Sequence, residues 1–187
     1  MADIVTESRE LLGRYPDHPL QPLGSKIGAF ADGIAELGRQ VDPEMARDRL
    51  CIVNTEVNSG NFIMSPAGLR LVDWEKAVVS YRYQDLGHFL VPTTTLWKSD
   101  VVFDPDRRAA FLQHYYEAAE PPVSYEQLDS CSRALERTIV LRALSWCYMA
   151  YAEYTQQQRA LFNTDTFATI ESYLERAEEF MESAGGP

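Results

Sequence analysis

The stretch NTEVNSGN at residues 54–61 sets a carboxylate, amides and a glycine between two short apolar runs. Glu56 and Asn61 lie five residues apart in it, and Asp73 ends a later apolar run. A carboxylate can orient or deprotonate a hydroxyl, whereas Mg²⁺ prefers carboxylate and amide oxygens. These groups must converge to act together, and Gly60 would allow the tight loop that this requires. The pattern is typical of a site that holds metal and phosphate.

The elements that must position these side chains are short and apolar. LCIV at 50–53 is predicted to form one strand, and NFIMS at 61–65 and LRLVDW at 69–74 are predicted to form a hairpin. SPAG at 65–68 has strong turn chemistry. We therefore expect Asp73 to end the hairpin strand that pairs with the strand after Asn61.

The rest of the chain is predicted to be helical. A helical period places four apolar residues on one face of a first helix: Ile27, Phe30, Ile34 and Leu37. Between Ile139 and Tyr151 the chain is apolar on nearly all sides of a helix, which predicts a central buried helix. Helices are expected at 2–14, 22–41, 84–91, 104–119, 124–159 and 164–183, with a polar connector at 42–49.

Composition limits the class of protein. The 187 residues, of which 45% are hydrophobic, suggest one domain with a substantial core. A net charge of -11 argues against nucleic acid as a partner, because such binding depends on Lys and Arg. No apolar run is long enough to span a membrane. The three cysteines form no C-x-x-C pair and the N-terminus is not a signal peptide, so we expect a cytoplasmic protein.

Residues 54–90 resemble the catalytic segment of the aminoglycoside phosphotransferase and choline kinase family, a branch of the protein-kinase-like fold. That family carries H-G-D-x-x-x-x-N, a hairpin, then I-D-W-E or I-D-F, then Y-D-L-A. NTEVNSGN, LVDWE and QDLGHF follow in the same order with compatible spacings. The specific motifs cover residues 50–90, and the helical layout agrees over about residues 20–160.

The resemblance implies a role for each matching residue. Glu56 takes the place of the catalytic Asp, and Asn61 and Asp73 take the places of the residues that bind Mg²⁺ and so hold ATP. Asn54 replaces the His of H-G-D, and Asp85 matches the Asp that supports the catalytic loop. The implied reaction transfers phosphate from ATP to a hydroxyl of an aminoglycoside, an amino-alcohol or a similar metabolite.

Two departures bear on activity. Glu56 is longer than Asp by one C–C bond, ~1.5 Å, and loss of the His at position 54 is expected to remove a contact that braces the loop. Residues 1–49 contain no run of strands, and their one lysine, Lys26, lies in a helical pattern. The chain is therefore expected to begin where the family's second lobe begins, as part of a longer protein or as a natural half-kinase.

The expected fold class is mainly α with a small β-hairpin element, a kinase-like C-terminal lobe without the N-terminal β lobe. It would be a single domain at 1–187: a helical lead-in at 1–49, the catalytic loop, hairpin and metal motif at 50–90, a helical subdomain at 91–183 and a frayed tail at 184–187.

Other interpretations remain open. A pseudokinase-like binding or scaffold module would explain the altered loop, with a partner chain that supplies the missing lobe, or a homodimer. An unrelated helical protein with a chance motif is the third. For single residues, Glu75 could face a substrate or be a surface carboxylate, Asn61 could be a left-handed turn residue, and Asp73 could cap a turn. His18 and His114 show no partner pattern.

Overall fold

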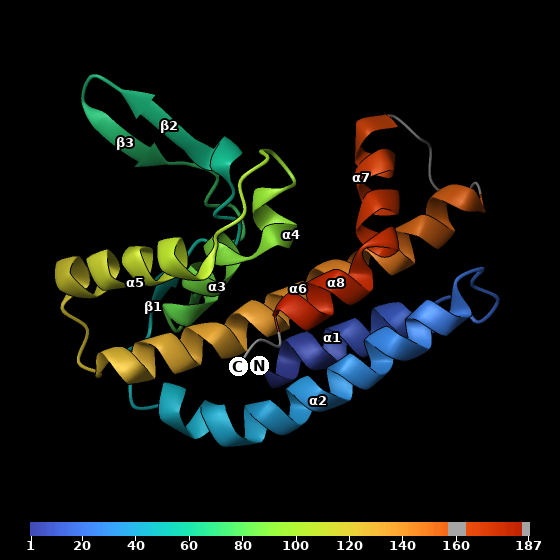
Figure 1. Cartoon of the computed structure of the whole chain (residues 1–187), viewed down its shortest axis with the longest axis horizontal. Coiled ribbons are helices and arrows are strands. Elements are labelled where there is room, and N and C mark those ends of the chain that lie inside the picture. The colour runs from blue at the N-terminus through green and yellow to red at the C-terminus, as the bar shows by residue number, and fades with distance from the viewer. Residues whose placement is uncertain (157–163, 185–187) are drawn as a thin grey trace. The chain divides into compact units, whose positions relative to one another are not determined.

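The computed structural model describes residues 1–156 and 164–184, and in them the chain is mainly helical with two small antiparallel sheets (Figure 1). This agrees with the expected mainly α class. No helix in these residues is both long and apolar enough to cross a membrane. The elements are α1 (Ala2–Gly13), α2 (Gln21–Met45), β1 (Cys51–Val53), η1 (Ser59–Asn61), β2 (Phe62–Ser65), β3 (Gly68–Leu71), β4 (Val78–Ser80), α3 (Tyr83–Leu90), α4 (Pro92–Thr95), α5 (Pro105–Ala119), α6 (Tyr125–Thr155), α7 (Thr164–Glu175) and α8 (Ala177–Ser183).

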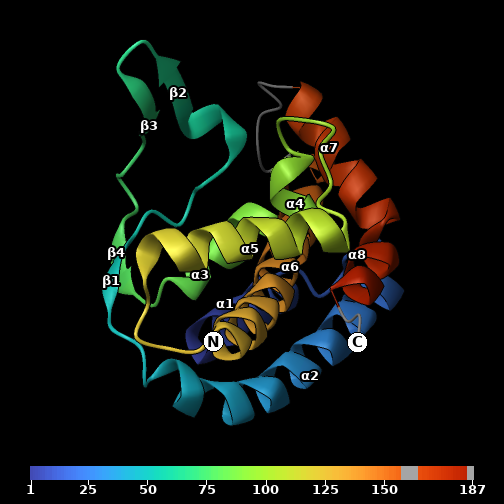
Figure 2. The ribbon, with the colours of Figure 1, turned by 60° about the vertical axis from the view of Figure 1, so that its left-hand side comes forward.

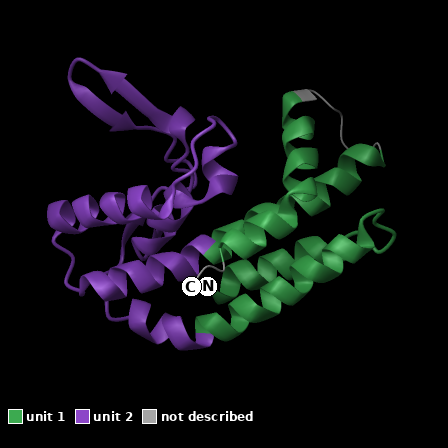
Figure 3. Ribbon diagram, in the orientation of Figure 1, with its two compact units in different colours: residues 1–38, 137–187 green, residues 39–136 purple. Residues whose placement is uncertain are grey.

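The chain divides into two compact units (Figure 3). Unit 1 comprises residues 1–38 and 137–187, and unit 2 comprises residues 39–136. Helices α2 and α6 each continue from one unit into the other. All the residues that the sequence marks as a candidate site belong to unit 2.

Unit 1 is built from helices whose apolar faces meet in a core. In α2, Ile27, Ala31 and Ile34 follow a helical period and are fully buried. The part of α6 from Ile139 to Ala152 buries most of its apolar side chains, which confirms the predicted central helix. The end of its predicted range, 157–159, lies outside the described residues, as do residues 185–187 of the predicted tail.

His18 is a buried anchor of unit 1 that the sequence did not reveal. Its Nε2 bonds the Tyr148 carbonyl oxygen at 2.7 Å, and its Nδ1 accepts a hydrogen bond from the Leu20 backbone N–H at 3.0 Å. The ring stacks on that of Tyr148 with centroids 3.5 Å apart. Both nitrogens are satisfied only by the neutral ring, and burial lowers the pKa of His18.

Several predicted boundaries were wrong. The connector at 42–49 is helical as far as Met45, because Val41 and Met45 continue the buried face of α2. The final helix is two helices, α7 and α8, separated at Arg176 by a backbone with φ −98° and ψ 10°. Neither Gly nor Pro lies near this break, so no local signal announces it. The short helix α4 was not expected.

Unit 2 contains both sheets. β2 and β3 form the predicted hairpin, with Phe62 opposite Leu71, and Gly68 closes its turn at φ +107°. The hairpin projects away from α3 and α5 (Figure 2). The predicted single strand β1 has a partner that was missed, β4, with Ile52 opposite Val79. VVS is too short to be recognised as a strand alone, and it becomes one by pairing with a distant segment.

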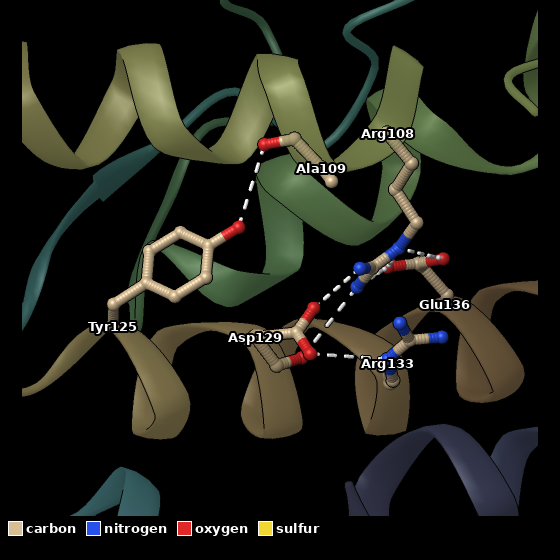
Figure 4. A network of polar contacts seen from close by, with 6 residues as sticks. All are labelled: Arg108, Ala109, Tyr125, Asp129, Arg133 and Glu136. Carbon is tan, nitrogen blue, oxygen red and sulfur yellow. Dashed lines mark hydrogen bonds and ion pairs between the residues drawn. The ribbon is translucent and has the colours of Figure 1, made fainter. Parts of the chain in front are cut away.

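Two ion-pair clusters fix the helices of unit 2. Arg108 of α5 is buried and bonds Asp129 and Glu136 of α6, and Asp129 also bonds Arg133 (Figure 4). Burial raises the pKa of Glu136, although Arg108 opposes this.

The second cluster joins the start of α3 to the segment before β1. Arg82 Nε donates to Asp48 Oδ2 at 2.7 Å, and Asp48 is 6% exposed. The adjacent Tyr83 is fully buried, and burial raises the pKa of its hydroxyl. The start of α3 is therefore tied to the segment that leads into β1, and the first turn of α3 carries Asp85.

Candidate active site

Asp85 holds the backbone at the start of the candidate loop. Its Oδ2 accepts from Asn54 N at 2.7 Å and its Oδ1 from Thr55 N at 2.8 Å. Thr55 has φ +68°, a left-handed conformation that a β-branched residue rarely adopts. The two charge-assisted hydrogen bonds hold this strained backbone in place.

Asn54 joins the loop to the segment that carries Asp73. The side chain is fully buried; its Oδ1 accepts from Glu56 N at 3.0 Å, and its Nδ2 donates to the Asp73 carbonyl oxygen at 2.8 Å. We expected that replacing the family's His would remove a bracing contact. In the structure, position 54 still braces the loop, because the Asn54 amide donates and accepts at once and so links both segments.

The loop from Glu56 to Asn61 folds around Asn58. Asn58 Nδ2 donates to the Glu56 carbonyl oxygen at 3.2 Å, and its Oδ1 accepts from Gly60 N at 3.0 Å. A Cβ on Gly60 would lie 3.1 Å from that same Oδ1, so this close approach explains the glycine. Asn61 is not a left-handed turn residue, since among the described residues the non-glycine positions with positive φ are Thr55, Asp73 and Glu120.

Asn61 and Asp73 flank the hairpin at its open end, Asn61 just before β2 and Asp73 shortly after β3. Val72 N donates to the Asn61 carbonyl oxygen at 2.9 Å, which places Asn61 opposite the residue before Asp73. The strand β3 ends at Leu71, so the expectation that Asp73 itself ends the strand was wrong by two residues. Asp73 has φ +61° and is exposed. Strained backbone of this kind concentrates at functional sites.

These two side chains carry oxygens of the kind that Mg²⁺ prefers. Asn61 Nδ2 donates to the Glu56 carbonyl oxygen at 2.8 Å, so the amide nitrogen is used within the loop and the oxygen is left for a ligand. The Asp73 carboxylate is exposed and forms no ion pair with any described residue. Mg²⁺ takes few protein oxygens and keeps several waters. In the described part of the chain, His, Cys, Asp and Glu form no group of three or more that could hold a metal, so an ion here would depend on Asn61 as well.

The Glu56 carboxylate is paired with a lysine. Lys76 Nζ lies 2.5 Å from Glu56 Oε1, and the Glu56 side chain is 29% exposed. Thr55 Oγ1 donates to the Lys76 carbonyl oxygen at 3.2 Å, so the backbones of the two segments are linked as well. The sequence did not predict that the positively charged Lys76 would lie beside the candidate base, although Lys76 directly follows the DWE motif.

The structure thus brings together five of the predicted residues: Asn54, Glu56, Asn61, Asp73 and Asp85. Gly60 belongs to the same loop. Glu75 is exposed beyond Asp73, and its role as a substrate contact stays a prediction. The residues that sequence reasoning missed are Thr55, Asn58 and Lys76, whose contributions depend on contacts that form only in the folded loop.

A scan against protein-family models found no match to this chain, and a search of curated proteins found none either.

Proposed function

We propose that this chain is part of a small-molecule phosphotransferase with a kinase-like C-terminal lobe. The reaction would transfer the γ-phosphoryl group of ATP to a hydroxyl of an aminoglycoside, an amino-alcohol or a similar metabolite. The proposal is supported mainly by one observation. Asp85 and Asn54 connect, through hydrogen bonds at 2.7–3.0 Å, the three segments whose motifs resemble that family.

In the proposed reaction, different residues of unit 2 bind the metal and accept the proton. Asn61 and Asp73 would hold Mg²⁺, which when bound neutralises charge on the nucleotide phosphates. Glu56 accepts the proton of the acceptor hydroxyl while the hydroxyl oxygen forms a bond to the γ-phosphorus and the bond from that phosphorus to ADP breaks. The hydrogen bonds to the backbone of residues 54–56 restrict the position of Glu56. This matters because about 1 Å of misplacement can cost ~10²-fold in rate.

The test is a calorimetric titration of the whole chain with Mg-ATP. We expect binding that Asp73→Ala weakens at least about tenfold, since a metal ligand is lost. Asp100→Ala is the matched control, because Asp100 is an exposed aspartate of the same unit with no hydrogen bond or ion pair to described residues. Failure of the wild-type chain to bind, or equal binding by the Asp73 variant, would overturn the proposal.

A binding or scaffold module is the second candidate function, and the surface of the sheets favours it. Large apolar side chains are exposed on both sheets, including Ile52 at 68%, Met64 at 78% and Val79 at 69%. Exposed apolar surface of this kind marks interaction sites. The partner would be a chain that supplies a β lobe, or a second copy. This function predicts concentration-dependent association in sedimentation and indifference to Mg-ATP.

The cysteines support a proposal for the compartment. Cys51, Cys131 and Cys147 are all free, and burial raises the pKa of Cys131 to about 11. Free thiols of this kind persist in a reducing environment, so we propose the cytoplasm.

A further inference from the structure

Two lysines approach the loop from Glu56 to Asn61 from two other segments of unit 2. Lys76 comes from the segment after Asp73, and Lys98 comes from the segment that follows α4. Neither belongs to a motif that suggested the site. Lys76 contacts the beginning of this short loop, and the side chain of Lys98 passes near its end, at Gly60.

Lys76 is fixed at the beginning of the loop. Its carbonyl oxygen accepts from Thr55 Oγ1 at 3.2 Å while its ammonium group contacts Glu56 Oε1 at 2.5 Å. Its side chain is still 58% exposed, so the ammonium group is accessible to an anion from solution. This charge is held by the ion pair with Glu56, and the backbone of Lys76 is tied to Thr55.

Lys98 lies over the end of the loop. Its Cγ would be 3.9 Å from a Cβ on Gly60, so its aliphatic stem lies beside the glycine. The residue is exposed, and its ammonium forms no ion pair with a carboxylate in the parts of the chain that the structure describes. Its backbone is anchored by the hydrogen bond from Lys98 N to the Thr95 carbonyl oxygen at 3.3 Å.

Local charge explains why such lysines are needed. Glu56, Asp73 and Glu75 surround the site with negative charge, and the whole chain carries -11. A polyphosphate would be repelled here unless cations offset these carboxylates. Lysine is a compact charge with three donors that suits phosphate oxygens.

We propose that Lys76 and Lys98 bind the polyphosphate chain of a nucleotide at the 56–61 loop. This inference rests on the proposed phosphotransferase function and assigns to it two residues that the family resemblance does not supply. On binding, Lys76 turns from Glu56 Oε1 to a phosphate oxygen. This frees the Glu56 carboxylate for the acceptor hydroxyl, so that the base becomes available once the phosphate has arrived.

The experiment uses inorganic tripolyphosphate as the probe, titrated calorimetrically into the whole chain in EDTA without metal. We expect Lys76→Met and Lys98→Met each to weaken binding about fivefold, the factor for one unit charge at ion-pair distance in water. Added salt should weaken binding by the wild-type chain. Lys26→Met is the matched control, because Lys26 pairs with Glu178 at 2.6 Å in unit 1 and is similarly exposed at 54%. Circular dichroism checks that each variant is folded.

The outcomes separate this inference from the function on which it rests. Tripolyphosphate binding that depends on Lys76 and Lys98 supports the inference even if Asp73→Ala leaves Mg-ATP binding unchanged, a result that would sink the proposed function alone. Mg-ATP binding that depends on Asp73 but not on either lysine would overturn the inference alone. Absence of tripolyphosphate binding, or an equal loss in Lys26→Met, also overturns the inference.

Discussion

Replacing Asp85 by Asn should loosen the candidate loop. In the native chain the carboxylate accepts two hydrogen bonds, from Asn54 N at 2.7 Å and Thr55 N at 2.8 Å. In the variant Asp85→Asn, the side-chain amide would keep one oxygen acceptor but present its nitrogen, a donor, to the other N–H. One charge-assisted bond is lost and the other becomes neutral, which should cost about 2–4 kcal/mol of local stability.

Amide hydrogen exchange measures this loss where it occurs. A cost of that size corresponds to a fall of about 30- to 1000-fold in the protection of Asn54 and Thr55. The positive φ of Thr55 makes its relaxation favourable once the bonds are lost. The control is Asp100→Asn in the same unit, which should leave both amides protected. Unchanged exchange at Asn54 and Thr55 in Asp85→Asn would refute the conclusion that Asp85 holds the loop.

Three further predictions concern stability. Gly87→Ala should lower the free energy of unfolding, measured with urea, by about 1–3 kcal/mol, because the new Cβ would lie within 3.0 Å of the backbone of α6. The control Gly33→Ala should be neutral or stabilising, because its Cβ would meet nothing within 4 Å. Burial lowers the pKa of His18 in the folded protein. The stability that the neutral ring contributes is therefore complete above the pKa of the unfolded chain, about 6.5, and is lost as the pH falls below that value toward the pKa of the folded protein. Urea midpoints at pH 7.5 and pH 5 should therefore differ less in His18→Gln than in the wild type. Arg108→Met leaves the half-buried Glu136 carboxylate without its ion-pair partner and leaves Asp129 with Arg133 alone, so it should cost about 2–4 kcal/mol in urea denaturation. Arg107→Met should cost less than about 0.5 kcal/mol, because its ion pair is exposed.

Each of these stability predictions has a result that would contradict it. Equal stability of Gly87→Ala and Gly33→Ala would mean that α3 and α6 are not in close contact. A pH dependence unchanged by the His18 substitution would mean that the ring is not held neutral. Equal effects of the two arginine substitutions would mean that the Arg108 network is open to water.

Part of the fold follows from local patterns. The hairpin was predictable because SPAG supplies its turn and the flanking runs are apolar. The central helix was predictable because an apolar surface on all sides has to be buried. Strand β4 and the break at Arg176 were not predictable, since one depends on pairing with β1 and the other has no local signal.

The candidate site shows the same division. Residue types and spacing determined which side chains are suited to bind a metal and accept a proton: Glu56, Asn61 and Asp73. Only the tertiary structure decided that Asn54 and Asp85 link these segments, and that Lys76 contacts Glu56. The physical reason is that side-chain chemistry is a property of the residue, whereas a hydrogen bond or ion pair between distant segments depends on how the chain folds back on itself.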